Sequence, residues 1–214
     1  MNEMNLADLR RDYIKDGLLE SDVDTNPFIQ FAKWFEQASK SGIVEPNAMS
    51  HATVAPDGQP SIRIVLLKGV DERGFVFYTN YESRKGKDMD LNPKSALLFF
   101  WGELERQVRI EGTVEKVDAE ISKAYFDSRP EGSRVGAWSS DQSEVVPSRD
   151  FLEARFEQNL AKFAGKQIPM PHYWGGYRLV PHTFEFWQGR GSRMHDRIRF
   201  RLVDGAWVTD RLSP

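Results

Sequence analysis

The 214-residue sequence contains no cysteine. Disulfide bonds, thiol nucleophiles and cysteine-ligated metals are therefore excluded. Long apolar segments are also missing, because the longest run covers residues 96–101, whereas a membrane-spanning helix needs about 20 apolar residues. The first residues are polar and partly acidic, unlike a secretory signal. These absences predict a cytoplasmic protein without a membrane segment.

Several common catalytic and binding motifs are absent as well. No Walker motif occurs, and Gly189-Arg190-Gly191 is only half of a dinucleotide-binding fingerprint. The histidines lack the close spacing of a metal site, and no serine stands in a nucleophile elbow. The formal net charge of −3 argues against a surface devoted to nucleic acid. We accordingly expect no metal and no nucleic-acid partner.

What the chain does contain is a local concentration of positive charge at residues 187–201. This segment, WQGRGSRMHDRIRFR, has five arginines and a histidine beside a single acid, Asp196. Arginine donates paired hydrogen bonds and keeps its charge when buried, so the segment fits an anion such as phosphate. A strand face whose arginines pair with carboxylates elsewhere explains the same pattern. The segment alone does not separate these two interpretations.

Hydrophobic residues make up 40% of the chain, which is enough for the core of a single domain over residues 1–214. Residues 1–25 are expected to form an N-terminal arm, with a short polar helix or arm at residues 6–15. A second helix is predicted to begin at Asn26-Pro27, because Asn caps helices and Pro suits the first helical position. Its expected apolar face contains Phe28, Phe31, Ala32, Trp34 and Phe35.

The rest of the chain is rich in strand signals. Runs of β-branched and aromatic residues predict strands at residues 49–54, 61–68, 75–79, 95–101, 106–114, 175–180, 183–188, 197–203 and 207–212. Helices are predicted at residues 118–128 and 148–163, with a loop at 136–146. Strict alternation of strands and helices is missing, so we predict a mostly antiparallel β-barrel with added helices, of the α+β class.

The segment Ser83-Arg84-Lys85-Gly86-Lys87 suggests a phosphate site. If Ser83 caps a helix, Arg84 and Lys85 fall in its first turn, where positive side chains oppose the helix dipole. A bound anion removes this conflict, and the free N–H groups and the hydroxyls of Thr79 and Ser83 suit a phosphate. An ordinary surface turn is the alternative explanation.

Two further segments carry cations that suit phosphate. Arg63 and Lys68 are five positions apart, so they are expected on opposite faces of a regular strand. This placement suggests two separate phosphates, or one phosphate on each side of a sheet shared between subunits. The segment at residues 125–133 adds Tyr125, Arg129 and Ser133 near the end of a predicted helix. Each set is weak evidence by itself.

Together, four segments resemble the pyridoxine (pyridoxamine) 5′-phosphate oxidase family. They are RIVLLK at 63–68, FYTNYESRKG at 77–86, YFDSRPEGSRVGAWSSDQS at 125–143 and FWQGRGSRMHDRIRFR at 186–201. Their order and spacing match from Arg10 onward. The resemblance implies a homodimeric FMN-binding split β-barrel, with two active sites at the dimer interface.

The implied activity is that of a pyridoxal 5′-phosphate synthase in vitamin B6 salvage. Pyridoxamine 5′-phosphate or pyridoxine 5′-phosphate would lose a hydride from C4′ to the flavin of FMN. O2 would then reoxidise the flavin and give H2O2, and the amine substrate would release ammonia. The protein's main contribution would be to position the two reactants.

The resemblance also assigns roles to individual residues. FMN contacts are expected from Arg63, Ile64, Val65, Leu66, Leu67, Lys68, Tyr78, Thr79, Arg84, Lys85, Gln107, Gln142, Ser143, Trp187 and Arg197, with Arg63, Arg84, Lys85 and Ser143 about the phosphate. The substrate phosphate is expected at Lys68, Tyr125, Arg129 and Ser133. Arg193 and His195 are expected to be catalytic and to orient the substrate ring beside Met194. Arg10, Arg11, Asp12 and Tyr13 would close over the substrate as a lid.

The sequence departs from the family pattern in a few places, and two other hypotheses stay open. Asp12 stands where Glu is common, and Met194 where Leu is common. A related split-barrel reductase or flavin carrier would retain Arg84 and Lys85 without needing the substrate residues. A nucleic-acid-binding barrel would use Arg197, Arg199 and Arg201, with Trp187 as a stacking platform, and would bind single strands in a salt-dependent way.

Overall fold

The computed structural model describes residues 13–15 and 17–214, and the chain divides into two compact units. Unit 1 comprises Met1–Pro46, Leu98–Ile110 and His182–Pro214, and unit 2 comprises Asn47–Leu97 and Glu111–Pro181. Most of the predicted arm, including the expected lid residues Arg10, Arg11 and Asp12, lies outside the described residues. The single domain over residues 1–214 stays a prediction.

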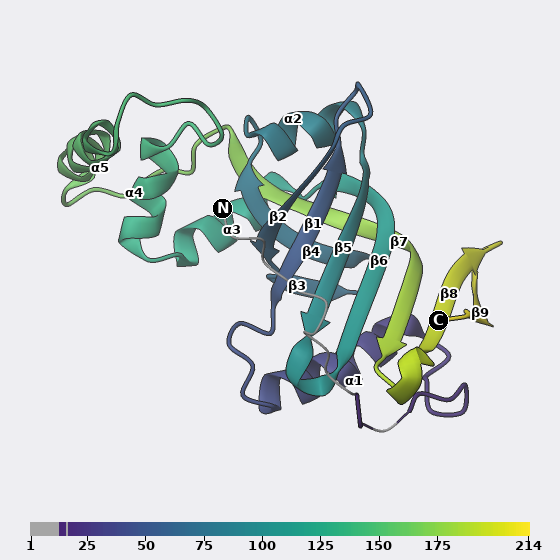
Figure 1. The fold of residues 1–214 in the computed structure, drawn as a ribbon. Coiled ribbons are helices and arrows are strands. Elements are labelled where there is room, and N and C mark those ends of the chain that lie inside the picture. The colour runs from purple at the N-terminus through teal and green to yellow at the C-terminus, as the bar shows by residue number, and fades with distance from the viewer. Residues whose placement is uncertain (1–12, 16) are drawn as a thin grey trace, which may run out of the picture. The chain divides into compact units, whose positions relative to one another are not determined.

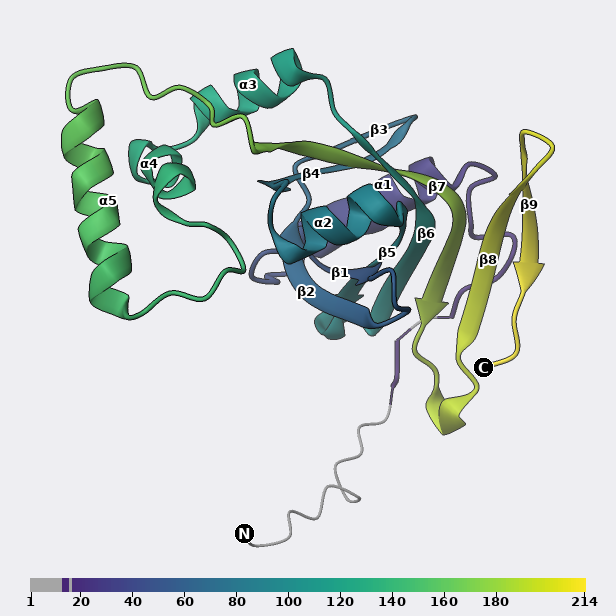
Figure 2. The same ribbon diagram turned by 90° about the horizontal axis from the view of Figure 1, so that it is seen from above.

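Unit 2 is built on an antiparallel sheet with the strand order β2-β1-β5-β6-β7-β4-β3 (Figure 1). This sheet curls, so that β2 returns close to β4 (Figure 2). Its own strands are β1 (Ala48–Val54), β2 (Pro60–Leu66), β3 (Gly69–Asp71) and β4 (Gly74–Asn80). Strands β5 (Lys94–Trp101), β6 (Arg106–Lys116) and β7 (Trp174–Gln188) each have residues in both units. The helices of unit 2 are α2 (Arg84–Leu91), α3 (Ala119–Ser128), α4 (Glu131–Ser139) and α5 (Arg149–Phe163).

Unit 1 combines one long helix with a terminal hairpin. It contains α1 (Pro27–Lys40), two 3-10 helices at Gly102–Leu104 and Gly191–Arg193, and strands β8 (Asp196–Val203) and β9 (Ala206–Arg211). Strand β8 pairs antiparallel with the last part of β7, and β9 with β8. Asp204 and Gly205 form the turn between β8 and β9, and both residues have positive φ, as a tight hairpin requires.

Aromatic side chains form much of the core in each unit. In unit 2, Phe126, Val135, Phe163 and Trp174 belong to one buried cluster that holds α3, α4 and α5 together. In unit 1, the predicted start of α1 is confirmed, since the Asn26 side chain accepts a hydrogen bond from the Phe28 N–H. The predicted apolar face of this helix is wrong at one position, because Ala32 is exposed. Among the described residues, no helix combines the length and the apolar character that a bilayer crossing requires.

Three local predictions differ from the structure. The loop expected at residues 136–146 begins later, because α4 extends to Ser139 and its fully buried Val135 packs in the cluster despite the low helix propensity of Gly136. The two strands expected around Pro181 are one strand, β7, which pairs with β4 before Pro181 and with β8 after it. The short strand β3 was not predicted.

Candidate active site

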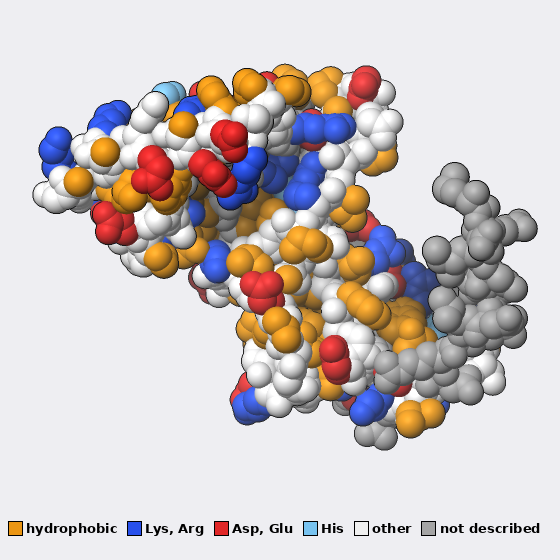
Figure 3. Space-filling model, turned by 60° about the vertical axis from the view of Figure 1, so that its left-hand side comes forward, with side chains coloured by type: hydrophobic (Ala, Val, Ile, Leu, Met, Phe, Trp, Pro, Cys, Tyr) orange, Lys and Arg blue, Asp and Glu red, His pale blue; other side chains and the backbone are white. Residues whose placement is uncertain are grey.

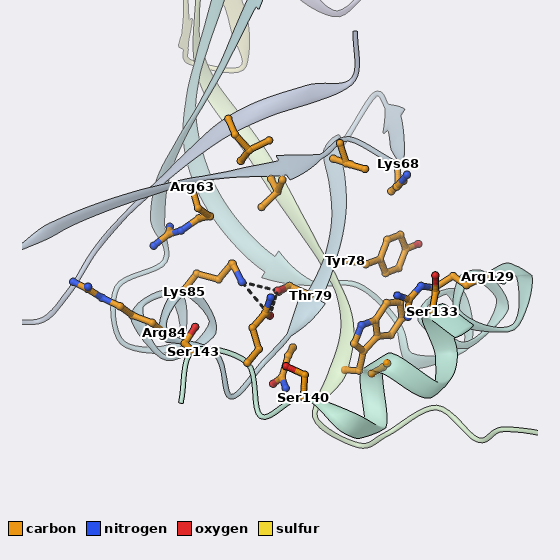
Figure 4. A pocket seen from close by; sticks show the side chains of 18 of the residues that line it. Arg63, Lys68, Tyr78, Thr79, Arg84, Lys85, Arg129, Ser133, Ser140 and Ser143 are labelled. Atoms are coloured by element: carbon orange, nitrogen blue, oxygen red, sulfur yellow. Dashed lines mark hydrogen bonds between the residues drawn. The ribbon is translucent and has the colours of Figure 1, made fainter. Parts of the chain in front are cut away.

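A cavity of about 990 Å³ lies in unit 2 (Figure 4). Strands β2 and β4, helix α2, the α3–α4 region and the start of β7 contribute its lining. Among the described lining residues there is no Asp or Glu, whereas the cations are Arg63, Lys68, Arg84, Lys85 and Arg129. In the space-filling view, lysine and arginine side chains gather around a hollow of the surface (Figure 3). Grouping cations without acids is electrostatically unfavourable, so this cavity fits an anionic ligand.

Lys85 marks one end of the cavity, near Arg63, Arg84 and Ser143 (Figure 4). Only 7% of the residue is exposed. Its Nζ donates to Thr79 Oγ1 at 2.9 Å and to Gln142 Oε1 at 3.2 Å, and none of its described partners is an acid. Burial, and then the charge of Arg63, lower the pKa of Lys85 to about 8. A buried ammonium with only neutral partners indicates a place for an anion.

Arg63 is oriented by groups on its own strand and on β1. Its guanidinium donates to Thr53 Oγ1 at 2.8 Å, to Ser61 Oγ at 2.7 Å and to the His51 carbonyl at 3.2 Å. Thr53 in turn donates to the buried carboxylate of Asp88 at 2.7 Å. Burial lowers the pKa of Arg63, and the charge of Asp88 opposes this effect. The side chain is therefore held in place before any ligand binds.

The predicted helix start at Ser83 is confirmed. Its Oγ accepts a hydrogen bond from the Gly86 N–H at 3.3 Å and donates to the Asn80 carbonyl at 2.7 Å. Ser83 is fully buried and does not line the cavity, so its hydroxyl serves the helix start. Thr79, the other hydroxyl expected there, does line the cavity.

The other end of the cavity contains Lys68, Arg129 and Ser133 (Figure 4). The Arg129 guanidinium lies over the Trp174 ring, with 4.8 Å between its central carbon and the ring centroid. Burial lowers the pKa of Arg129, and its buried NH1 has no hydrogen-bond partner among the described residues. Such an orphaned donor fits a phosphate oxygen better than an apolar group.

An aromatic stack of Tyr78, Tyr125 and Trp174 lies beside this second end. The ring centroids of Tyr78 and Tyr125 are 3.9 Å apart, and those of Tyr78 and Trp174 are 5.5 Å apart, with nearly parallel planes. The stack gives the cavity a flat apolar wall next to its cations. A ligand with a planar ring and a phosphate matches this end, because the ring fits the flat wall and the phosphate fits the cations.

Most of the expected cofactor and substrate residues of unit 2 line this one cavity. They are Arg63, Ile64, Val65, Leu66, Lys68, Tyr78, Thr79, Arg84, Lys85, Tyr125, Arg129, Ser133, Gln142 and Ser143, whereas Leu67 does not line it. The expectation that Arg63 and Lys68 lie on opposite faces is wrong, because β2 ends at Leu66 and its alternation does not reach Lys68. Trp174 was missed, since an aromatic residue at the start of a strand signals core packing.

In unit 1, three of the expected residues form a ring cluster: Tyr13, Trp187 and His195. The centroids of Trp187 and His195 are 4.7 Å apart, and Tyr13 lies 5.6 Å from each. His195 Nδ1 accepts a hydrogen bond from the Arg190 N–H at 3.1 Å. This bond assigns the proton of the neutral ring to Nε2. Burial, and then the charge of Arg193, lower the pKa of His195, which favours that neutral form.

The loop before His195 has an unusual backbone. Ser192 and Arg193 have φ values of 55° and 60°, in the left-handed region. Each such residue costs on the order of 1–3 kcal/mol, and strain of this kind is concentrated at functional sites. Arg193 is exposed and forms no ion pair with a described residue, and Met194 beside it is 67% exposed. Arg193 therefore keeps its charge available for a ligand.

Other arginines of the segment 187–201 pair with carboxylates. Arg197 forms a bidentate pair with buried Glu185, at 2.9 and 3.1 Å, and Arg199 and Arg201 share Asp210. The expected FMN contact of Arg197 stays a prediction, whereas the paired strand face is the correct interpretation for Arg199 and Arg201. Their neutralised charge also weakens the nucleic-acid hypothesis.

Gln107, a further expected cofactor residue, is half-buried on β6 in the same unit as Trp187 and Arg197.

Comparisons with known proteins agree with this geometry. Residues 35–162 match the family model described as pyridoxamine 5′-phosphate oxidase, and residues 174–214 match the pyridoxine 5′-phosphate oxidase C-terminal dimerisation region. A pyridoxine/pyridoxamine 5′-phosphate oxidase from Cupriavidus pinatubonensis is 61% identical over 210 residues, 98% of this chain and 99% of the relative. One from Acaryochloris marina is 56% identical over 212 residues, 99% and 97% of the two chains.

Solved structures support the same assignment. PhzG from Burkholderia lata, in complex with tetrahydrophenazine-1-carboxylic acid, has a TM-score of 0.87 and 29% identity, and the match covers 93% of this chain and 98% of that one. A pyridoxamine 5′-phosphate oxidase-related, FMN-binding protein from Nostoc punctiforme shares the fold, with a TM-score of 0.70 and 16% identity over 90% of this chain and all of that one. The predicted split barrel is confirmed. With its full-length relatives and matching family model, the chain belongs to the pyridoxamine 5′-phosphate oxidase family.

Proposed function

We propose that this protein is an FMN-dependent oxidase that converts pyridoxamine or pyridoxine 5′-phosphate to pyridoxal 5′-phosphate. Dioxygen would accept the electrons and give H2O2, and with the amine substrate water would hydrolyse the resulting imine and release ammonia. The observation that carries the proposal is the cavity of unit 2, which has cations at both ends and no carboxylate among its described lining residues. FMN and the substrate each bring one phosphate, so two cationic ends match two ligands.

The end around Lys85 suits the phosphate of FMN. Arg63, Arg84, Lys85 and Ser143 would hold it, and the buried Lys85 ammonium would gain the anionic partner that its described neighbours do not provide. FMN, when bound, supplies the redox chemistry of the reaction. The residues of the chain bind and orient both reactants.

The end around Arg129 suits the substrate phosphate. Lys68 and Arg129 would provide charge, Ser133 a hydroxyl, and the orphaned NH1 of Arg129 would gain an acceptor. Tyr125 and Trp174 support this end, because Tyr125 belongs to the aromatic stack and Trp174 carries the Arg129 guanidinium on its face. Charge-assisted bonds of this kind account for recognition of the 5′-phosphate group.

The ring cluster of unit 1 suits the pyridine ring of the substrate. Neutral His195 would donate from Nε2 to the ring oxygen, and Arg193 would supply a positive charge to the same group. Tyr13 would cover the ring. In this proposal His195 and Arg193 orient the substrate carbon that is oxidised, and orientation is their contribution to the rate.

We further propose that the active enzyme is a cytoplasmic homodimer. The matched region at residues 174–214 is described as a dimerisation region in its family. Strand β2 exposes Ile62 and Ile64, at 68% and 63%, where they also line the cavity. A second copy of the chain would cover these side chains, and residues such as Gln107, Trp187 and Arg197 would complete the cofactor site.

The decisive experiment is an assay of purified protein loaded with FMN. We expect a yellow protein that forms pyridoxal 5′-phosphate and H2O2 from at least one of the two substrates, in proportion to O2 consumed. No product from either substrate would overturn the proposal. Because PhzG was crystallised with tetrahydrophenazine-1-carboxylic acid, the same assay with that compound tests a second substrate class.

A further inference from the structure

Glu105 is a buried acid that the function proposed above does not use. It is 1% exposed, and its Oε2 accepts hydrogen bonds from the N–H groups of Ile14, at 3.0 Å, and Lys15, at 3.1 Å. No described cation forms an ion pair with it. A buried carboxylate is costly unless it is well hydrogen-bonded, so these two backbone donors are its main compensation.

The backbone of Glu105 binds a second segment. Its carbonyl accepts hydrogen bonds from the Gly189 N–H at 2.7 Å and from Gln188 Nε2 at 3.2 Å. Ile14 directly follows Tyr13, and Gln188 directly follows Trp187. One residue therefore holds both chain segments from which the Tyr13 and Trp187 rings extend.

The conformation of Glu105 makes this position unusual. Its φ is 55°, a left-handed value that favours glycine or asparagine. A glutamate at such a position indicates that its side chain is needed there. Glu103, two residues earlier, is exposed and forms no hydrogen bond with a described side chain.

Gly189 provides the space for the contact between the two segments. A Cβ atom at this position would lie 2.7 Å from Cγ of Tyr13 and 3.1 Å from Cβ of Glu105. A side chain there would push Tyr13 away. The close approach of Tyr13 thus depends on both the carboxylate of Glu105 and the missing side chain of Gly189.

We propose that Glu105 is a positioning residue that fastens the segment of Tyr13 to the segment of Trp187 and so places Tyr13 against His195. This inference rests on the proposed function, in which Tyr13 and His195 contact the substrate ring. Glu105 itself touches neither ligand. Its effect on the reaction is to fix one wall of the ring site.

Three variants of the FMN-loaded full-length enzyme test this role. Glu105→Gly removes the carboxylate and also relaxes the left-handed backbone, so the fold is retained. Glu105→Gln keeps a carbonyl oxygen that accepts the same N–H groups. Glu103→Gly is the matched control, because it removes a nearby exposed acid.

Hydrogen exchange at Ile14 and Lys15 and the steady-state kinetics are measured for each variant. In Glu105→Gly we expect exchange at these two amides to be at least about tenfold faster, because their acceptor is lost. We expect KM for pyridoxamine 5′-phosphate to rise about tenfold with kcat within about twofold, since substrate binding and not redox chemistry is affected. Glu105→Gln should stay within about threefold of wild type, and Glu103→Gly should match it.

Two results would overturn the inference. Unchanged exchange at Ile14 and Lys15 in Glu105→Gly would show that the carboxylate does not hold the segment. Faster exchange with an unchanged KM would show that the segment does not shape the substrate site. A wild-type protein that forms no pyridoxal 5′-phosphate overturns the proposed function instead, and the exchange comparison still decides whether Glu105 holds the segment.

Discussion

At the level of single residues, the lowered pKa of Lys85 couples protons to phosphate binding. Because the ligand-free side chain titrates near pH 8, the site loses a positive charge as pH rises through this value. An anion binds the charged form, so affinity must fall above pH 8. We predict that the Kd for FMN rises between pH 8 and 9.5, by at most about tenfold per pH unit. Quenching of flavin fluorescence measures this Kd.

Two substitutions serve as tests of this assignment. Lys85→Arg keeps a positive charge at all these pH values and should flatten the profile. Lys87→Met, on the same helix, removes a cation that is exposed and paired with Glu144, and it should leave the profile unchanged. A wild-type Kd that is constant from pH 7 to 9.5 would contradict the proposed role of Lys85.

The lowered pKa of Lys85 also determines how this residue changes the stability of the folded protein with pH. Its pKa is lower in the folded protein than the usual value of 10.5, so the unfolded chain binds more protons between these values. This group therefore makes the ligand-free protein more stable as pH rises from about 8 towards 10.5. At neutral pH the charged Lys85 side chain therefore favours binding of an anion at its end of the cavity, but it lowers the free energy of unfolding of the ligand-free protein.

Arg129 leads to a second prediction. Arg129→Met removes a guanidinium whose NH1 has no described partner, so substrate binding loses charge-assisted bonds. We expect KM for the phosphorylated substrate to rise roughly 10- to 100-fold, with FMN binding unchanged. The unfolding midpoint of the ligand-free protein should not fall, because burial of an unpaired cation is unfavourable.

The matched control for Arg129 is Arg149→Met on α5. Arg149 is exposed and pairs with Glu153 within one helix turn, so KM should not change. Steady-state kinetics and thermal unfolding distinguish the two variants. Equal KM values in Arg129→Met and wild type would remove Arg129 from the proposed phosphate site.

The sequence predicts some of these residues and misses others for a physical reason. Arg63, Lys85 and Arg129 stand out because each is a cation in a local pattern that suits phosphate. Trp174 and Glu105 do not, because their roles depend on contacts with residues far away in the chain. Glu105, for example, binds a segment 91 positions earlier.

At the level of elements, the Ser83 cap of α2 contributes both to the stability of this helix and to the position of Lys85 in the cavity. Ser83→Ala removes the acceptor for the Gly86 N–H and a contact of the Lys85 ammonium. We predict a loss of about 1–2 kcal/mol in unfolding free energy, as for other cap residues, together with weaker FMN binding. Chemical denaturation and flavin titration measure the two effects.

Ser148→Ala provides the comparison for this prediction. Ser148 caps α5 in the same way, with its side chain accepting from the Phe151 N–H. Its loss should cost about 1 kcal/mol of stability without any effect on FMN binding. If both variants bind FMN equally well, α2 does not organise the phosphate end.

Local sequence signals predict helix starts better than they predict strand ends. Asn26, Ser83 and Ser148 all form the capping bonds that their residue types suggest. The sequence predicts two strands on either side of Pro181, but β7 is continuous there. Its pairing with β4 ends before Pro181 and its pairing with β8 begins after it, so the missing N–H of Pro181 breaks no bond to either strand. The end of β2 at Leu66 depends on pairing with β1, which no local pattern reveals.

At the level of the whole molecule, the proposed homodimer can be tested on β2. We predict that Ile62→Asp shifts the protein towards the monomer, because burial of a carboxylate against a second copy is unfavourable. Light scattering during size-exclusion chromatography measures the mass. Val44→Asp is the control, since Val44 is also an exposed apolar residue, at 87%, and should leave the mass unchanged. A monomeric wild-type protein with full activity would contradict the dimer.

The described residues that line the cavity include no acid, and this affects how long the protein persists in a cell. Five like charges face one space, so the flavin phosphate of the proposed function would serve as a counter-ion that the described lining residues do not provide, as well as part of the catalyst. A ligand that binds only the folded state raises its population and reduces its exposure to proteases. Under flavin starvation, the abundance of this protein should therefore decline together with its activity.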